Sequence, residues 1–239
     1  MAHAGLCAVC PGTGRVVLCL DEPGGPGGAG SACGLCEIYG SGLQPASGNR
    51  GRKLQGRTDI ALSEEGRRSA LETGEELADV SFSAAFSSPL ARARETAELI
   101  LRGRDVPVQT DERLVELSFG SAEGMYLSDL APERQPTFRL FAAPEAYVPP
   151  EGGESYASLE VRCRAFLEEV ILPHEKDWEQ VLIVAHGGTV RGLFSAMFGR
   201  ASNEIYGSHV QKNCAVNIVD CTAGNFTLDV FAGEFCEKL

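Results

Sequence analysis

The feature that most constrains the fold is an uninterrupted apolar run near the end of the chain, QVLIVA at residues 180–185. A strand without polar alternation is buried on both faces, which is typical of a parallel sheet with helices on both sides. The segments before this run alternate between strand and helix patterns, which predicts an α/β fold with a mostly parallel central sheet. With 239 residues, 44% of them hydrophobic, the chain has enough apolar side chains for such a core.

Caps and periodicity predict the neighbouring elements. Ser63 precedes two glutamates that suit the positive end of a helix dipole, so residues 62–77 are expected to form a helix capped by Ser63. Residues 84–102 are predicted to form a short strand, a turn and a helix with Pro89 at its first position. The remaining expectations are two helices and a hairpin, at 158–171, 189–198 and 215–231 respectively.

The first 36 residues differ in composition from the rest of the chain. The stretch DEPGGPGGAGSACG cannot pack a core, so residues 1–36 are expected to be a flexible, low-complexity segment rich in Gly, Pro and Cys. Residues 37–239 are then the folded domain. Only RVVLCL at 15–20 has, within the first segment, the β-branched run of a buried strand.

Charge and hydropathy exclude several classes of function. The formal charge of −12 argues against nucleic acid, because most of the surface would repel its phosphates. No apolar run approaches the length of about 20 residues that spans a bilayer, so no membrane partner is expected. No basic stretch precedes an apolar one at the N-terminus, and a cytoplasmic location is therefore expected.

Three polar residues stand where strands end or helices begin. His186 follows the 180–185 run and precedes two glycines, so its imidazole is expected at the sheet edge beside exposed amides. Arg92 lies in a first helical turn, where a guanidinium and helix amides can hold one anion, unless it forms a surface pair with Glu95. Glu116 is either a proton donor or a solvated loop carboxylate. Together the three supply what phosphoryl transfer needs.

Five ordered motifs resemble the histidine phosphatase superfamily, also called phosphoglycerate-mutase-like: LQGRTDIALSEEG, SSPLARARETA, DERLVELSFGSAEG, PPEGGES and VLIVAHGGTVRG. The resemblance covers roughly residues 37–239 and implies a three-layer α/β/α sandwich that transfers phosphoryl groups without a metal or another cofactor. In that family a histidine in an Arg-His-Gly motif on the first strand attacks phosphorus, and water hydrolyses the phosphohistidine.

Carried over by position, the resemblance assigns roles to six residues. Arg92 resembles a phosphate-clamping arginine, Glu116 the proton donor to the leaving oxygen, and His186 the histidine that stabilises the transferring group. The positions expected to bind substrate are Asn49, Arg57 and Gly187.

The motif that supplies the nucleophile is missing from its expected place. Counting back from LQGRTD without gaps sets Arg-His-Gly on Gly42, Leu43 and Gln44, and a leucine cannot attack phosphorus. In an alternative alignment RVVLCLDEPG occupies the first strand and Asp21 takes the nucleophile position, where a carboxylate could form an aspartyl phosphate. A further alternative makes His186 itself the nucleophile. The composition of residues 1–50 also resembles GC-rich coding sequence read in a shifted frame.

Two C-x-x-C pairs leave zinc binding open. Two such knuckles can hold a tetrahedral zinc ion, but a Gly/Pro-rich linker separates them here instead of a hairpin. The cysteines concerned are Cys7, Cys10, Cys33 and Cys36.

The sequence therefore predicts a phosphomonoester hydrolase of the histidine phosphatase type that acts on a small phosphorylated metabolite and is impaired by the missing motif. One alternative is a pseudophosphatase that binds a phosphate ester without cleaving it. Another is a phosphotransferase of the phosphoglycerate mutase type, which the short stretch after Glu116 disfavours. The sequence does not fix the oligomeric state.

Overall fold

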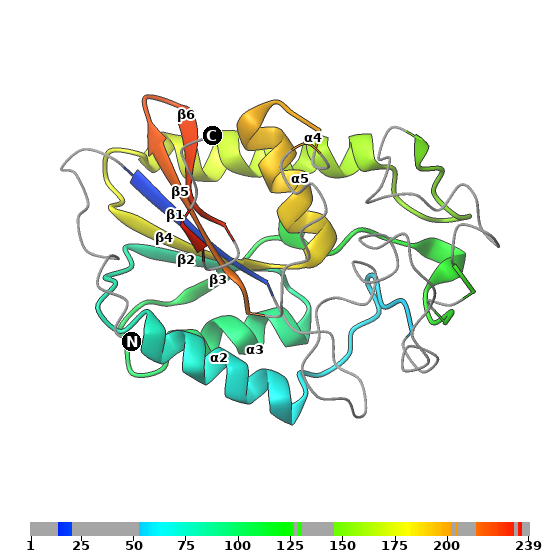
Figure 1. The fold of residues 1–239 in the computed structure, drawn as a ribbon, viewed down its shortest axis with the longest axis horizontal. Helices are drawn as coiled ribbons and strands as arrows, with labels where there is room; N and C mark the ends of the chain where they lie inside the picture. Colours follow the sequence, from blue (N-terminus) through cyan, green and yellow to red (C-terminus); the bar gives the residue numbers. More distant parts are fainter. Residues whose placement is uncertain are drawn as a thin grey trace.

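The architecture is a three-layer α/β/α sandwich around one seven-stranded sheet (Figure 1). The computed structural model describes residues 14–20, 53–126, 129–130, 146–201, 204, 214–231 and 234–235. The strand order is β3-β2-β4-β1-β5-β6-β7. The strands are β1 (Gly14–Leu20), β2 (Ala84–Ser87), β3 (Val108–Thr110), β4 (Gln180–Ala185), β5 (Val216–Thr222), β6 (Asn225–Phe231) and β7 (Glu234–Phe235). Strands β3, β2, β4 and β1 are parallel, and β5, β6 and β7 continue the sheet antiparallel. The predicted fold class is confirmed.

Strand β1 lies before residue 37, where the folded domain was expected to begin. Gly14–Leu20 forms β1, which pairs in parallel with β4 and antiparallel with β5 and so lies in the middle of the sheet. The expectation that residues 1–36 stand outside the folded domain is therefore wrong for this strand, and the buried strand predicted from RVVLCL at 15–20 is confirmed. Gly42, Leu43 and Gln44 lie outside the described residues.

Burial on both faces explains why β1 takes a central position. Val16 and Leu18 pack into the core on the side of α4 (Tyr156–Phe166) and α5 (Gly187–Phe198). Val17 and Cys19 point into the opposite core, on the side of α2 (Glu64–Glu76) and α3 (Ala91–Ile100). All four side chains are at most 2% exposed, as the continuous apolar run requires.

The helices form the two outer layers, with α2 and α3 on one face of the sheet and α4 and α5 on the other (Figure 1). Ser63 caps α2 by accepting a hydrogen bond from the Gly66 amide at 3.0 Å, which confirms the predicted start of this helix. Helix α3 begins two residues after Pro89, so the expectation of Pro89 at the first helical position is wrong. The predicted hairpin is confirmed as β5 and β6. No helix within the described part of the chain is long and apolar enough to cross a membrane.

Candidate active site

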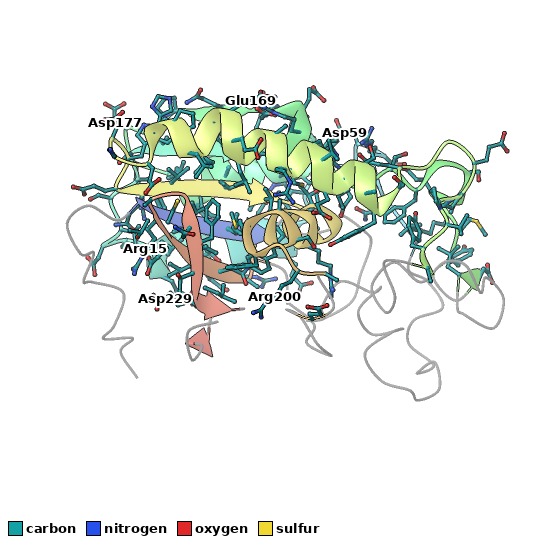
Figure 2. All side chains as sticks on the ribbon, turned by 90° about the horizontal axis from the view of Figure 1, so that it is seen from above. Arg15, Asp59, Glu169, Asp177, Arg200 and Asp229 are labelled. Atoms are coloured by element: carbon teal, nitrogen blue, oxygen red, sulfur yellow. The ribbon has the colours of Figure 1, made fainter. Side chains whose placement is uncertain are left out.

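The candidate site lies at the carboxyl edge of the parallel strands. Ser87, the last residue of β2, is in register with Val184 of β4, so Ser88 and His186 leave the sheet at the same edge. In Figure 2, Arg15 and Asp177 mark the end where β1 and β4 begin, and Asp59 lies toward the other end. Asp59 accepts a hydrogen bond from the Ala91 amide at 2.8 Å, which ties its loop to the start of α3. Ligands of open α/β sheets bind at this edge.

His186 is held between a hydroxyl and a guanidinium. It is the N-cap residue of α5 and only 1% exposed. Its Nε2 lies 2.6 Å from Oγ of Ser88, and its Nδ1 lies 3.3 Å from a terminal nitrogen of Arg92. The ring is therefore fixed on both sides. A guanidinium can only donate, so Nδ1 accepts from Arg92 and the tautomer that fits both contacts donates from Nε2 to Ser88.

Arg92 points inward from the first turn of α3. It is 3% exposed and donates to the carbonyls of Thr58 and Gly56, both at 3.0 Å. The alternative of a surface pair with Glu95 is wrong, because Glu95 accepts from Arg67 of α2 instead. Two carbonyl oxygens carry only partial charges, so they orient the guanidinium without cancelling its full positive charge at these contacts.

Glu116 caps the helix that begins after His186. It follows a short 3-10 turn, η2 (Glu112–Leu114), and its carboxylate accepts from the amides of Gly188 at 3.2 Å and Thr189 at 3.1 Å. It also accepts from the Leu117 amide at 2.7 Å. Glu116 is therefore not a solvated loop carboxylate. Its contacts place it one helical turn from the imidazole.

The positions expected to bind substrate have different outcomes. Arg57 lies at the rim with 41% of its side chain exposed, and donates to the Glu116 carbonyl at 3.0 Å and to Glu154 at 3.1 Å. Gly187 is the first residue of α5, between His186 and the amides that Glu116 holds. Asn49 lies outside the described residues.

Sequence reasoning missed two residues that the geometry brings into the site. Ser88 contacts His186 directly, and its signal was its position at the end of β2, on the same edge as His186. Glu123 accepts hydrogen bonds from the loop that holds Arg92, and no local pattern signals that role.

An imidazole and a buried guanidinium on one sheet edge form a setting for an oxyanion. The fold and this site define a class, the α/β/α proteins of the phosphoglycerate mutase type. The chain belongs to the histidine phosphatase superfamily (branch 1), whose family model matches residues 45–233. The match begins after β1, so the central strand is a part of the domain that the family model does not reach.

Curated relatives include both mutases and phosphatases. The chain is 35% identical over 149 residues to the 2,3-bisphosphoglycerate-dependent phosphoglycerate mutase 2 of Gloeobacter violaceus, covering 61% of this chain and 68% of the relative. It is 33% identical over 172 residues to the uncharacterized phosphatase PhoE of Bacillus subtilis, covering 71% and 81%.

Among solved structures, a mycobacterial glucosyl-3-phosphoglycerate phosphatase in complex with VO3 is similar to the chain, with a TM-score of 0.71 and 26% identity. The similarity covers 92% of this chain and 99% of that structure.

Proposed function

We propose that this chain binds a small phosphate monoester at the site formed by Arg92, Glu116 and His186, and that it hydrolyses the ester slowly. The observation that carries the proposal is the buried contact of 3.3 Å between Arg92 and His186 at the carboxyl edge of the sheet. Two cationic or proton-bearing groups that face one another away from water suit the charge of a phosphoryl group.

Each residue has a chemical task in this proposal. Arg92 and His186 hold the equatorial oxygens of the transferring group and stabilise the charge that develops on them. Glu116 gives a proton to the leaving oxygen, which needs a protonated carboxyl at that step. Names of relatives, among them phosphatases and mutases, support a small phosphorylated substrate.

Slow hydrolysis follows from the position of β1. Leu20 is in register with Ala185, the residue before His186, so the nucleophile of the family would follow β1. The residues at that point of the sequence are Leu20, Asp21 and Glu22 instead of Arg-His-Gly. Loss of a catalytic nucleophile costs about a millionfold in turnover in a well-studied protease, and we expect a comparable loss here.

His174, which the structure describes besides His186, is not placed to replace the nucleophile. His174 stacks on Trp178 with ring centroids 4.2 Å apart, directly before β4 and thus at the opposite edge of the sheet. His3 and His209 lie outside the described residues. A phosphotransferase of the mutase type needs the same nucleophile, so it would be impaired for the same reason.

The test compares two placements of the lost motif. We expect the unmodified chain to hydrolyse p-nitrophenyl phosphate at a rate near background. The triple variant Leu20→Arg, Asp21→His, Glu22→Gly should raise turnover at least about a hundredfold, since nucleophile and base effects reach this size. The matched control is Gly42→Arg, Leu43→His, Gln44→Gly, which should not.

Binding is measured separately from turnover. Inorganic phosphate should raise the melting temperature of the unmodified chain, and Arg92→Ala should reduce the rise without removing it, because His186 remains. Fast turnover by the unmodified chain that Asp21→Asn abolishes would contradict slow hydrolysis and indicate an aspartyl nucleophile. A melting temperature that phosphate leaves unchanged would contradict binding.

A further inference from the structure

We propose that Glu123 is a positioning residue that sets the orientation of Arg92 through the peptide groups of residues 56–58. This role rests on the proposed function, because it matters for binding only if Arg92 holds a phosphate. Glu123 follows a 3-10 turn, η3 (Gly120–Ala122), which lies in a different loop from residues 56–58. No role was assigned to Glu123 from the sequence.

The carboxylate of Glu123 accepts hydrogen bonds from two sides. Oε1 accepts from the amides of Arg57 and Phe119, both at 3.1 Å. Oε2 accepts from the amide of Thr58 at 3.0 Å and from its hydroxyl at 2.9 Å. Three of these four donors belong to Arg57 and Thr58, so Glu123 fixes the backbone there by both of its oxygens.

The same backbone segment holds Arg92 from its other side. The peptide group that joins Gly56 and Arg57 gives its N–H to Glu123 and accepts from Arg92 through its C=O. Because a peptide group is a rigid plane, the position of its N–H determines the position of its C=O. The Thr58 carbonyl, two residues after that of Gly56, accepts a second hydrogen bond from Arg92.

The charges reinforce this arrangement. A carboxylate on the N–H side of a peptide and a guanidinium on its C=O side align with the peptide dipole, and hydrogen bonds in such a chain strengthen one another. Glu123 therefore strengthens the hydrogen bonds between Arg92 and the carbonyls of residues 56–58, and it does so through the peptide groups that it binds.

Gly56 shows how closely the parts fit. Its φ of +56° lies in the left-handed region, and a Cβ at this residue would come 2.3 Å from Oε1 of Glu123. Any other residue would displace the carboxylate or the loop. The side chain of Arg57 then reaches the Glu116 carbonyl, so the same segment also contacts the loop that carries the proposed proton donor.

The test measures the Kd for inorganic phosphate by calorimetry on the full chain. Glu123→Gln keeps the size of the side chain but replaces one of its two acceptor oxygens by an NH2 group. That group cannot accept from a backbone amide, so at least one of the hydrogen bonds to Glu123 is lost. We expect phosphate binding about tenfold weaker, the effect of one charge-assisted hydrogen bond.

The matched control is Glu175→Gln. Glu175 likewise accepts from two backbone amides, those of Ala223 and Gly224 in the turn between β5 and β6. It lies close to the start of β4, at the edge of the sheet away from the site. Glu175→Gln should lower the melting temperature and leave the Kd for phosphate unchanged.

A double-mutant cycle separates positioning from general stability. If Glu123 acts through Arg92, Glu123→Gln should have no further effect on the Kd in an Arg92→Ala background. If Glu123→Gln changes the Kd equally in both backgrounds, or leaves the Kd of the single variant unchanged, the positioning role of Glu123 is overturned, while the proposed function stands.

Should Glu123→Gln fail to fold, Thr58→Val removes one of the four hydrogen bonds to Glu123 and should give the same non-additive pattern, with an effect on the Kd of about two- to threefold. Absence of phosphate binding in the unmodified chain would overturn the proposed function, and this role with it.

Discussion

At the scale of single residues, the site depends on polar and charged side chains that are buried, although such side chains are usually exposed to solvent. Arg92 and His186 are both almost fully buried, yet each has hydrogen-bonding neighbours that orient it. A buried charged or polar group without such neighbours would cost several kcal/mol, about 2–7 for a hydroxyl or amide. Ser88 and the carbonyls of Gly56 and Thr58 therefore make the buried site possible.

The buried cysteines should be unreactive in the folded protein. Burial raises the pKa of the Cys163 thiol to about 12, and that of Cys221 to about 11. The thiolate is the reactive form, so at pH 8 we expect iodoacetamide to modify neither residue within minutes. In urea both should react quickly. Mass spectrometry of the peptides decides, and rapid labelling of native Cys163 would contradict the packing of α4 against α5.

At the scale of elements, short loops at the carboxyl edge are fastened by arginines. Arg113 in η2 pairs with Asp111 at 2.7 Å and with Glu169 at 2.6 Å, and donates to the Ala165 carbonyl at 3.2 Å. These bonds join the end of β3 to the end of α4. Glu116 lies three residues after Arg113, so its place depends on this junction.

Acid should weaken this junction. Burial alone would raise the pKa of Asp111, but hydrogen bonds from the Arg113 side chain and amide, together with its charge, outweigh burial and lower the pKa below 3.8. A carboxyl whose pKa is lower in the folded than in the unfolded protein stabilises the fold at every pH above its unfolded pKa. This stabilisation disappears as the pH falls through the pKa of the folded state.

We therefore expect Asp111→Asn to reduce the free energy of unfolding at pH 7 by about 1–2 kcal/mol, in the range of one charge-assisted hydrogen bond. The difference from the unmodified chain should shrink steadily below pH 3.8. Urea titrations at several pH values measure it. A difference that does not change with pH would contradict the ion pair.

Local signals identified most elements but did not determine where β1 pairs in the sheet. The Ser63 cap and the 180–185 run determine their own conformation, so α2 and β4 were predictable. Strand β1 owes its central place to β4 and β5, which are remote in sequence, so its β-branched run indicated a strand but not its partners.

The residues of the candidate site also fall into a predictable and an unpredictable group. His186 and Arg92 stand at the ends of predictable elements. Glu123 acts through contacts between two loops, which no periodicity describes. The alternative of a surface pair between Arg92 and Glu95 could not be decided from the sequence, because the partner of Glu95 is Arg67 on the neighbouring helix.

At the scale of the whole molecule, the two cores on either side of the sheet meet at β1. Leu18 is fully buried in one and Val17 is 1% exposed in the other. Removing side-chain volume from this strand should affect the stability of the entire domain.

Leu18→Ala should lower the free energy of unfolding by about 2–5 kcal/mol, the cost of a large-to-small change in a core. The matched control is Val161→Ala in α4, where the side chain is 69% exposed, and its expected effect is within about 0.5 kcal/mol. Chemical denaturation compares the two. A loss for Leu18→Ala no larger than that for Val161→Ala would contradict the central place of β1.

The place of β1 also determines when the protein can finish folding on the ribosome. Strand β1 has its two neighbours at 180–185 and 216–222, so both β4 and β5 must follow it out of the ribosome before its two edges are paired. During that interval the side chains of VVLC are available to other nascent chains and to chaperones. A circular permutant that carries residues 14–20 beyond the present C-terminus would shorten the interval, and we expect it to aggregate less during synthesis.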